Sequence, residues 1–154
     1  MLQKSPQIYI EFIFAVQRYE NIILPHWRDC LYKCISEIIT EKKQKVIIVN
    51  GMPDHIHVLV GLKPNLSMAD LVGFIINGSS KFINENKFVK GKFEWQEGFG
   101  GFSCGESDLN SVYNSILNQE EFHKRVTFKQ EFIEYLNINE IEFDERNLFE
   151  WIDY

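Results

Sequence analysis

The chain has 154 residues, enough for one domain and too few for two of ordinary size. It is 45% hydrophobic and 25% charged, the balance of a globular protein with a core, which excludes disordered and fibrous chains. No apolar run reaches the ~18 residues of a membrane span, and residues 1–6 lack the apolar region of a signal peptide. Three cysteines, an odd number, argue against a disulfide framework, and we expect a cytoplasmic protein.

The net charge of −6 is concentrated at the C-terminal end. Residues 131–154 contain eight acidic residues and one basic residue, so residues 1–130 hold 14 acidic and 15 basic residues. A nearly neutral body is not the strongly basic footprint that is typical of DNA-binding proteins. We expect one domain over residues 1–154, with residues 131–154 either packed on it or serving as a dimer arm.

The first half of the chain predicts three strands and two helices. Hydrophobic patterning indicates, in chain order, a strand at 8–16, a helix at 25–41, strands at 45–49 and 55–61, and a helix at 67–86. Ser67 is suited to cap the second helix at its N-terminus. Asn50-Gly51 is the usual hairpin signal, so we place a turn at residues 50–54.

The second half predicts one more strand and two more helices. The elements are a short strand or extended piece at 92–95, a flexible glycine loop at 98–101, a helix from about 108 to 123, and a helix that begins at Thr127. Gln130 stands in capping-box position to Thr127. The order β-α-β-β-α-β followed by two helices predicts an α/β (α+β) fold of the ferredoxin-like, RRM-like type. Its antiparallel sheet carries helices on one face, with the extra helices at the C-terminal end.

The first candidate site is His55-Ile56-His57. In a strand, residues i and i+2 point to the same face, so both imidazoles project together and could chelate a divalent ion with one or two further ligands. Taken alone, this pair is more often two half-buried histidines on a sheet face.

The second candidate is the helix at 108–123. Ser115 and Gln119 are four residues apart and therefore share one helix face. Tyr113 falls on the apolar stripe instead, where a tyrosine is more typical of core than of a nucleophile.

Four motifs in this order resemble the single-tyrosine HUH transposases of the insertion sequence 200/605 type. They are NGMPDHIHVLV at 50–60, FEWQEGFGGFS at 93–103, ILNQEEFH at 116–123 and IEFDER at 141–146. The resemblance covers nearly the whole chain, from residue 8 to about residue 151. It favours a metal site over the interpretation of the pair as two half-buried histidines on a sheet face.

The resemblance implies a role for each matching position. His55 and His57 would bind the catalytic Mg²⁺ or Mn²⁺, and Gln119 would complete the metal site. In this family a helix tyrosine four residues before the glutamine attacks a single-stranded DNA phosphate, which leaves a 5′-phosphotyrosine link and a 3′-OH. The family works as a homodimer on DNA hairpins at the ends of the element, and the helix of one subunit can complete the metal site of the other.

This chain departs from the family pattern at its most important position. Ser115 stands at the tyrosine position, Phe122 replaces the first of two paired histidines, Ile76 stands for a lysine and Glu11 for a histidine. A serine hydroxyl is less acidic than a phenol and ends one bond beyond Cβ, so its reach is short. We therefore expect the fold and metal site of a DNA transposase without the family's nucleophile.

Several alternatives stay open at this point. Ser115 itself could attack, or another tyrosine such as Tyr113 or Tyr19 could substitute. The chain could instead be a non-catalytic relative that binds hairpin DNA or inhibits an active copy, or a metal-dependent phosphodiesterase that uses water. For DNA contacts we select Lys81, which begins a basic and aromatic stretch, and Lys124 and Arg125, which follow the motif helix. A basic stretch of this kind is also typical of a solvated helix end.

Overall fold

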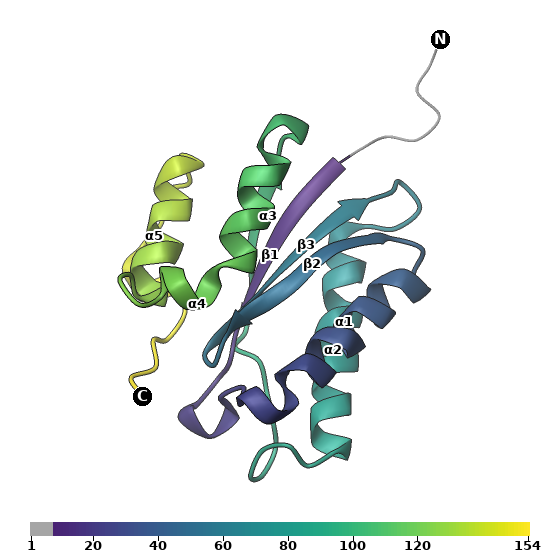
Figure 1. Ribbon diagram of the computed structural model, residues 1–154, viewed down its shortest axis with the longest axis vertical. Coiled ribbons are helices and arrows are strands. Elements are labelled where there is room, and N and C mark those ends of the chain that lie inside the picture. The colour runs from purple at the N-terminus through teal and green to yellow at the C-terminus, as the bar shows by residue number, and fades with distance from the viewer. Residues whose placement is uncertain (1–7) are drawn as a thin grey trace.

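The computed structural model describes residues 8–154 and contains one four-stranded antiparallel sheet with strand order β2-β3-β1-β4 (Figure 1). The strands are β1 (Ile8–Ala15), β2 (Lys45–Met52), β3 (His55–Leu62) and β4 (Gly100–Cys104). The β-α-β-β-α-β order and the central position of β1 and β3 confirm the predicted ferredoxin-like architecture.

Two helices, α1 (Pro25–Glu41) and α2 (Met68–Glu85), cover one face of the sheet (Figure 1). Alternate residues of β1 and β3 supply the apolar side chains of this face, among them Phe12, Phe14 and Val58, all buried. The Ser67 hydroxyl accepts a hydrogen bond from the Asp70 amide at 3.1 Å, which confirms the predicted cap of α2.

The opposite face is covered by α3 (Leu109–Leu117), α4 (Gln119–Phe122) and α5 (Phe128–Ile138). A second apolar cluster holds α5 to the sheet, and it includes Ile13, Phe102 and Phe132. The capping box of Thr127 and Gln130 is present at the start of α5, as predicted. The extra C-terminal helices thus give the sheet a second covered face.

The C-terminal segment packs on the same chain in this structure. Phe143, Leu148, Phe149 and Trp151 join the second apolar cluster. The Gln96 side chain also holds this segment, because it accepts from the Glu150 amide at 2.7 Å and donates to the Glu150 carbonyl at 2.7 Å. Three short 3-10 helices complete the described chain, at Tyr19–Asn21, Glu106–Asp108 and Glu145–Asn147.

The turn predicted at residues 50–54 is shorter in the structure. Asn50 and Gly51 lie inside β2, and the chain turns at Pro53 and Asp54. Gly51 is required for close approach rather than for a turn, because a Cβ there would collide with the backbone of His55 on β3. Asn50 donates to the Ile116 carbonyl at 2.9 Å and so connects β2 to α3.

The region after α2 also differs from the prediction. Trp95 forms only an isolated bridge with Val16, and the fourth strand runs over 100–104, so it includes Gly100 and Gly101 of the predicted loop. The helix predicted at 108–123 is divided between α3 and α4 at Asn118, whose side chain donates to the Asn114 carbonyl at 2.9 Å. In the part of the chain from residue 8 onward, no helix is long and apolar enough to cross a membrane.

Candidate metal centre

A buried polar cluster lies in the middle of the sheet face that α3, α4 and α5 cover. His55 and His57 point to this face from β3, and the register that pairs Ile13 with His57 puts Glu11 of β1 on the same face. The helices contribute Gln119 from α4 and Glu131 from α5, and all five side chains are at most 2% exposed. Buried polar groups of this number are costly unless they bond to one another or to an ion.

Three imidazoles converge on one carboxylate oxygen. The Nε2 atoms of His55, His57 and His123 lie 3.3, 3.0 and 3.3 Å from Glu131 Oε1. These four residues offer ligand atoms that all lie within 4.8 Å of one another. Gln119 joins them, since its Oε1 lies 3.1 Å from His55 Nε2 and 3.0 Å from His123 Nε2.

The outer nitrogen of each ring is held by an acceptor. His55 Nδ1 is 2.7 Å from Asp54 Oδ1, His57 Nδ1 is 2.8 Å from Glu11 Oε1, and His123 Nδ1 is 2.7 Å from the Val126 carbonyl. These oxygens only accept, so each Nδ1 can donate to its own partner, while each Nε2 faces the acceptor oxygens of the centre. Carboxylates and carbonyls hold metal-bound histidines in the same way.

The electrostatics of the centre favour a positive charge within it. Burial alone would lower the pKa of His57, but the charge of Glu131 and the hydrogen bonds to Glu11 and Glu131 raise it to about 10. Burial alone would raise the pKa of Glu131, but the charge on His57 and hydrogen bonds from the three histidines hold it well below its usual range. A ring with an acceptor oxygen at both nitrogens either carries a second proton or gives its Nε2 lone pair to a bound cation.

These residues fit a divalent metal ion. They offer three imidazole nitrogens, one carboxylate oxygen and one amide oxygen, and their outer hydrogen bonds already orient the rings. A bound cation would satisfy the lone pairs, neutralise Glu131 and polarise an oxygen of a bound phosphate.

The structure brings together the three metal-site residues that the sequence predicted, which are His55, His57 and Gln119. Sequence reasoning missed His123 and Glu131, which complete the inner cluster, and Asp54 and Glu11, which orient the rings. His123 stands within a recognised motif, so a signal for it existed. Glu131 falls in the acidic segment, and no spacing connects it to β3.

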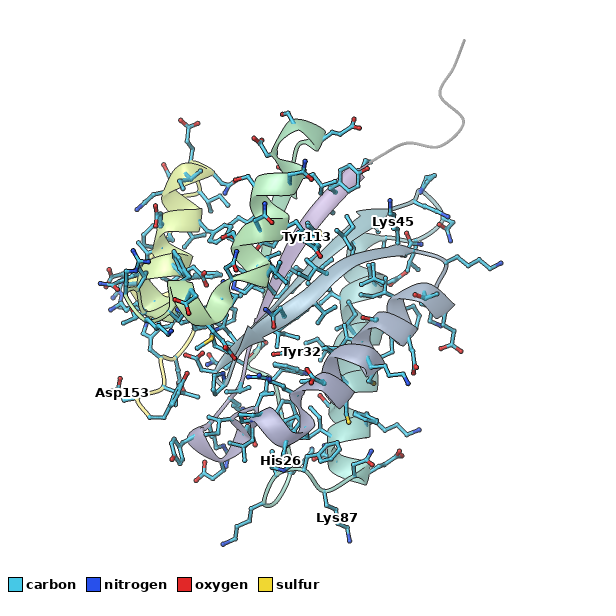
Figure 2. All side chains as sticks on the ribbon, viewed as in Figure 1. His26, Tyr32, Lys45, Lys87, Tyr113 and Asp153 are labelled. Atoms are coloured by element: carbon cyan, nitrogen blue, oxygen red, sulfur yellow. The ribbon has the colours of Figure 1, made fainter. Side chains whose placement is uncertain are left out.

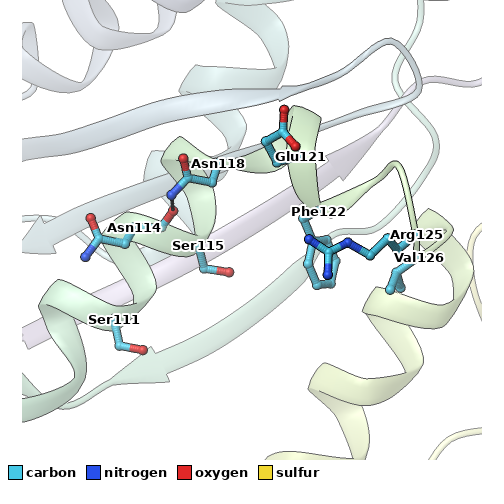
Figure 3. Close-up of a pocket in the computed structure, with 8 residues that line it drawn as sticks. All are labelled: Ser111, Asn114, Ser115, Asn118, Glu121, Phe122, Arg125 and Val126. Carbon is cyan, nitrogen blue, oxygen red and sulfur yellow. Dashed lines mark hydrogen bonds between the residues drawn. The ribbon is translucent and has the colours of Figure 1, made fainter.

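Ser115 lies beside the centre rather than within it. It lines a cavity of about 470 Å³ between α3 and the segment after α4, and its hydroxyl points toward Phe122, with Arg125 beyond (Figure 3). The two tyrosines named as substitutes do not line this cavity. Tyr113 is 36% exposed on the side of α3 away from α5 (Figure 2), and Tyr19 is 58% exposed in the first 3-10 helix.

A different tyrosine, Tyr135 of α5, faces the site. Its hydroxyl donates to Glu11 Oε1 at 3.0 Å, and its side chain lines a cavity together with Ser115. Burial, followed by the charges of Glu11 and Glu131, raises the pKa of Tyr135 above its usual range, so the phenol is protonated at neutral pH.

The predicted DNA-contacting residues occupy different sides of the molecule. Lys81 is exposed on α2, across the sheet from the metal centre, with Glu85 3.9 Å away. Lys124 is exposed and pairs with Glu121 at 2.7 Å. Arg125 lines the same cavity as Ser115, and it is the cation of these three that borders the site.

Two solved structures share this fold. A putative transposase from Deinococcus radiodurans has 18% identity and a TM-score of 0.61, over 77% of this chain and 95% of that one. A REP-associated tyrosine transposase bound to a REP hairpin has 12% identity and a TM-score of 0.60, over 82% of this chain and 74% of that one. No curated protein matches this chain significantly. The family described as IS200-like transposase matches residues 4–119, so this chain belongs to the IS200-like transposases.

Proposed function

We propose that this protein binds single-stranded DNA hairpins and holds a backbone phosphate at a divalent metal ion for strand cleavage and rejoining. The observation that carries the proposal is the convergence of three histidine Nε2 atoms on Glu131 Oε1 at 3.0 to 3.3 Å, beside Gln119. Membership of the IS200-like transposases and a fold shared with a transposase bound to a REP hairpin support hairpin DNA as the substrate class.

The donor set favours Mn²⁺ over Mg²⁺ as the resident ion. Mg²⁺ prefers oxygen ligands and keeps several waters, whereas imidazole nitrogen suits first-row transition ions. Three of the five inner donors here are imidazole nitrogens, from His55, His57 and His123. When bound, the ion would supply a positive charge that stabilises the leaving oxygen.

Residues of this chain have separable tasks in the proposed reaction. Asp54 and Glu11 orient His55 and His57, so the ring lone pairs stay aimed at the centre. Arg125 would hold a phosphate at the rim of the cavity. The Ser115 hydroxyl is not the nucleophile in this proposal, since it ends one bond beyond Cβ and its reach is short.

Three further statements belong to the same proposal. The chain acts as a single transposase-like domain, it functions as a homodimer in which helices could be exchanged, and it works in the cytoplasm. The three cysteines, all free in the structure, support a reducing compartment.

The test uses the purified protein, Mn²⁺ and labelled single-stranded hairpins from the flanks of its own gene. Electron paramagnetic resonance measures Mn²⁺ binding, and gel mobility shift measures hairpin binding. We expect the protein to bind Mn²⁺ and the hairpin. We expect His57→Gln to lose Mn²⁺ binding and to keep its fold, as measured by circular dichroism. A protein that binds neither Mn²⁺ nor any hairpin would overturn the proposal.

One observation favours a second function, that of a non-catalytic hairpin-binding or inhibitory relative. The inner imidazoles are already bonded to Glu131 and Gln119 within the chain, so the cluster can fold without an ion. In that case hairpin binding would be independent of Mn²⁺, and no variant would form a covalent link to DNA. Free 5′-phosphate ends without a covalent link would instead indicate a phosphodiesterase that uses water.

A further inference from the structure

We propose that Tyr135, on α5, supplies the nucleophilic oxygen that α3 lacks in this chain. The inference rests on the proposed function, because it needs a DNA phosphate held at the metal centre. It does not repeat the sequence expectation, which considered Ser115, Tyr113 and Tyr19. Its basis is the position of one phenol relative to Glu11, Ser115 and the histidine cluster.

The Tyr135 hydroxyl is separated from a metal-binding histidine by a single carboxylate oxygen. Glu11 Oε1 accepts from the phenol at 3.0 Å and from His57 Nδ1 at 2.8 Å. The phenol ring lies beside the imidazole of His57, with ring centroids 6.3 Å apart. An acceptor in direct contact with the hydroxyl is the arrangement that activates an alcohol or phenol for attack.

Ser115 and Tyr135 occupy one space from two helices. Both line a cavity of about 470 Å³ that Glu11 and Glu131 also border. A short side chain at 115 leaves room for a phenol that enters from α5.

Other tyrosines are less well placed. Tyr113 and Tyr19 are exposed and line neither cavity at Ser115. Tyr154 lies near Asp54 and is 59% exposed. The Tyr135 hydroxyl bonds to Glu11, a group that also holds a ring of the cluster.

The proposed step is a balanced phosphoryl transfer. The Tyr135 phenol oxygen attacks the phosphorus of the scissile phosphodiester, and its proton passes along the hydrogen bond to the Glu11 carboxylate. The bond from phosphorus to the 3′ oxygen breaks, and that oxygen takes a proton from water. The products are a 5′-phosphotyrosine link at Tyr135 and a free 3′-OH, and the link conserves the bond energy for rejoining.

The experiment looks for a covalent protein-DNA link under denaturing conditions. The full chain is incubated with Mn²⁺ and the labelled hairpins, and the adduct is digested and mapped by mass spectrometry. We expect a phosphotyrosine peptide that contains residue 135. Tyr135→Phe keeps the ring and should reduce the adduct by ~10³-fold or more, while Mn²⁺ and hairpin binding remain unchanged. Tyr113→Phe and Tyr154→Phe are the matched controls and should retain it.

Each result separates this inference from the proposed function beneath it. An adduct at Tyr154, Ser115 or any residue other than Tyr135 overturns the inference and leaves the proposed function in place. In a second outcome the protein binds the hairpin and Mn²⁺ without forming an adduct, while Ser115→Tyr forms one. That result shows an intact metal site and also overturns the role of Tyr135. If neither Mn²⁺ nor any hairpin binds, the proposed function fails and this inference fails with it.

Discussion

The two faces of the sheet are built from the same strands but carry different side chains, apolar on one face and partly charged on the other. Under α1 and α2, β1 and β3 present only apolar side chains, such as Phe12, Phe14 and Val58. Under α3, α4 and α5, the intervening residues of the same strands include Glu11 and His57, at the centre of an apolar rim. A shift of one residue along a strand separates the core from the candidate site.

This difference shows how the fold tolerates a buried charged cluster. Burial of charged groups opposes folding unless each one is paired, so the site face contributes less net stability than its packing suggests. The face under α1 and α2 has no such cost, and the stacked rings of Trp27 and Phe88, with centroids 5.2 Å apart, add to its packing. Stability and chemistry should therefore be separable by mutation.

The largest expected effect on stability is at the apolar face. Phe12→Ala removes a fully buried ring, and we expect it to lower the free energy of unfolding by ~3–5 kcal/mol because a cavity remains. Chemical denaturation measures this loss. Mn²⁺ affinity of the folded fraction should not change, and a large drop in affinity would show that the two faces are coupled.

The next effect is at the centre of the site face. Glu131→Gln keeps the volume but removes the oxygen on which three imidazoles converge, so Mn²⁺ affinity should fall ~100-fold or more. Glu134→Gln, an exposed position on the same helix, is the matched control. Equal affinity in the two variants, measured by calorimetric titration, would remove Glu131 from the ligand set.

The site face should also give the metal-free protein a distinctive pH dependence. The pKa of His57 is raised to about 10, against burial, by the charge of Glu131 and by hydrogen bonds to Glu11 and Glu131. Its contribution to stability is fully present below the ordinary histidine pKa of ~6.5 and is lost as the pH rises through about 10.

We therefore expect the free energy of unfolding in the presence of a chelator to fall between pH 7 and 9. His57→Gln should flatten this slope, because it removes the group whose raised pKa produces it. Both proteins are compared by urea denaturation at each pH. A slope that is identical in the two proteins would contradict the assignment of the proton to His57.

Local patterns predicted the fold well, because each element carries its own signal. Apolar runs predicted β1 and β3, and Ser67 and Thr127 gave two helix starts that the structure confirms. The Asn50-Gly51 turn failed because a tertiary contact, the close approach of Gly51 to His55, overrides the local preference of that dipeptide.

The site could be predicted only in part. His55, His57 and Gln119 were found through motifs, but Glu131 is 74 residues from its partner His57 and shares no pattern with it. Tyr135 is further separated, 124 residues from Glu11, and a tyrosine on an amphipathic helix is typical of packing. Contacts of this range are set by how α5 docks on the sheet, which local spacing does not encode.

The smallest effect compares the two faces as DNA surfaces. Arg125 lines the cavity beside Ser115, whereas Lys81 lies on α2 across the sheet, with Glu85 3.9 Å away. A cation that contacts one phosphate releases about one counterion, so Arg125→Ala should weaken hairpin binding and lower the salt slope of log K by ~1.

Lys81→Ala removes the same charge from the opposite face and should change neither the hairpin affinity nor its salt slope. Titrations of a labelled hairpin at several salt concentrations measure both quantities. If Lys81→Ala instead has the larger effect, the DNA lies against the helices of the apolar face. The phosphate could then not reach His55 and His57 through the cavity that Arg125 borders, and the proposal of a cleavage site there would have to be abandoned.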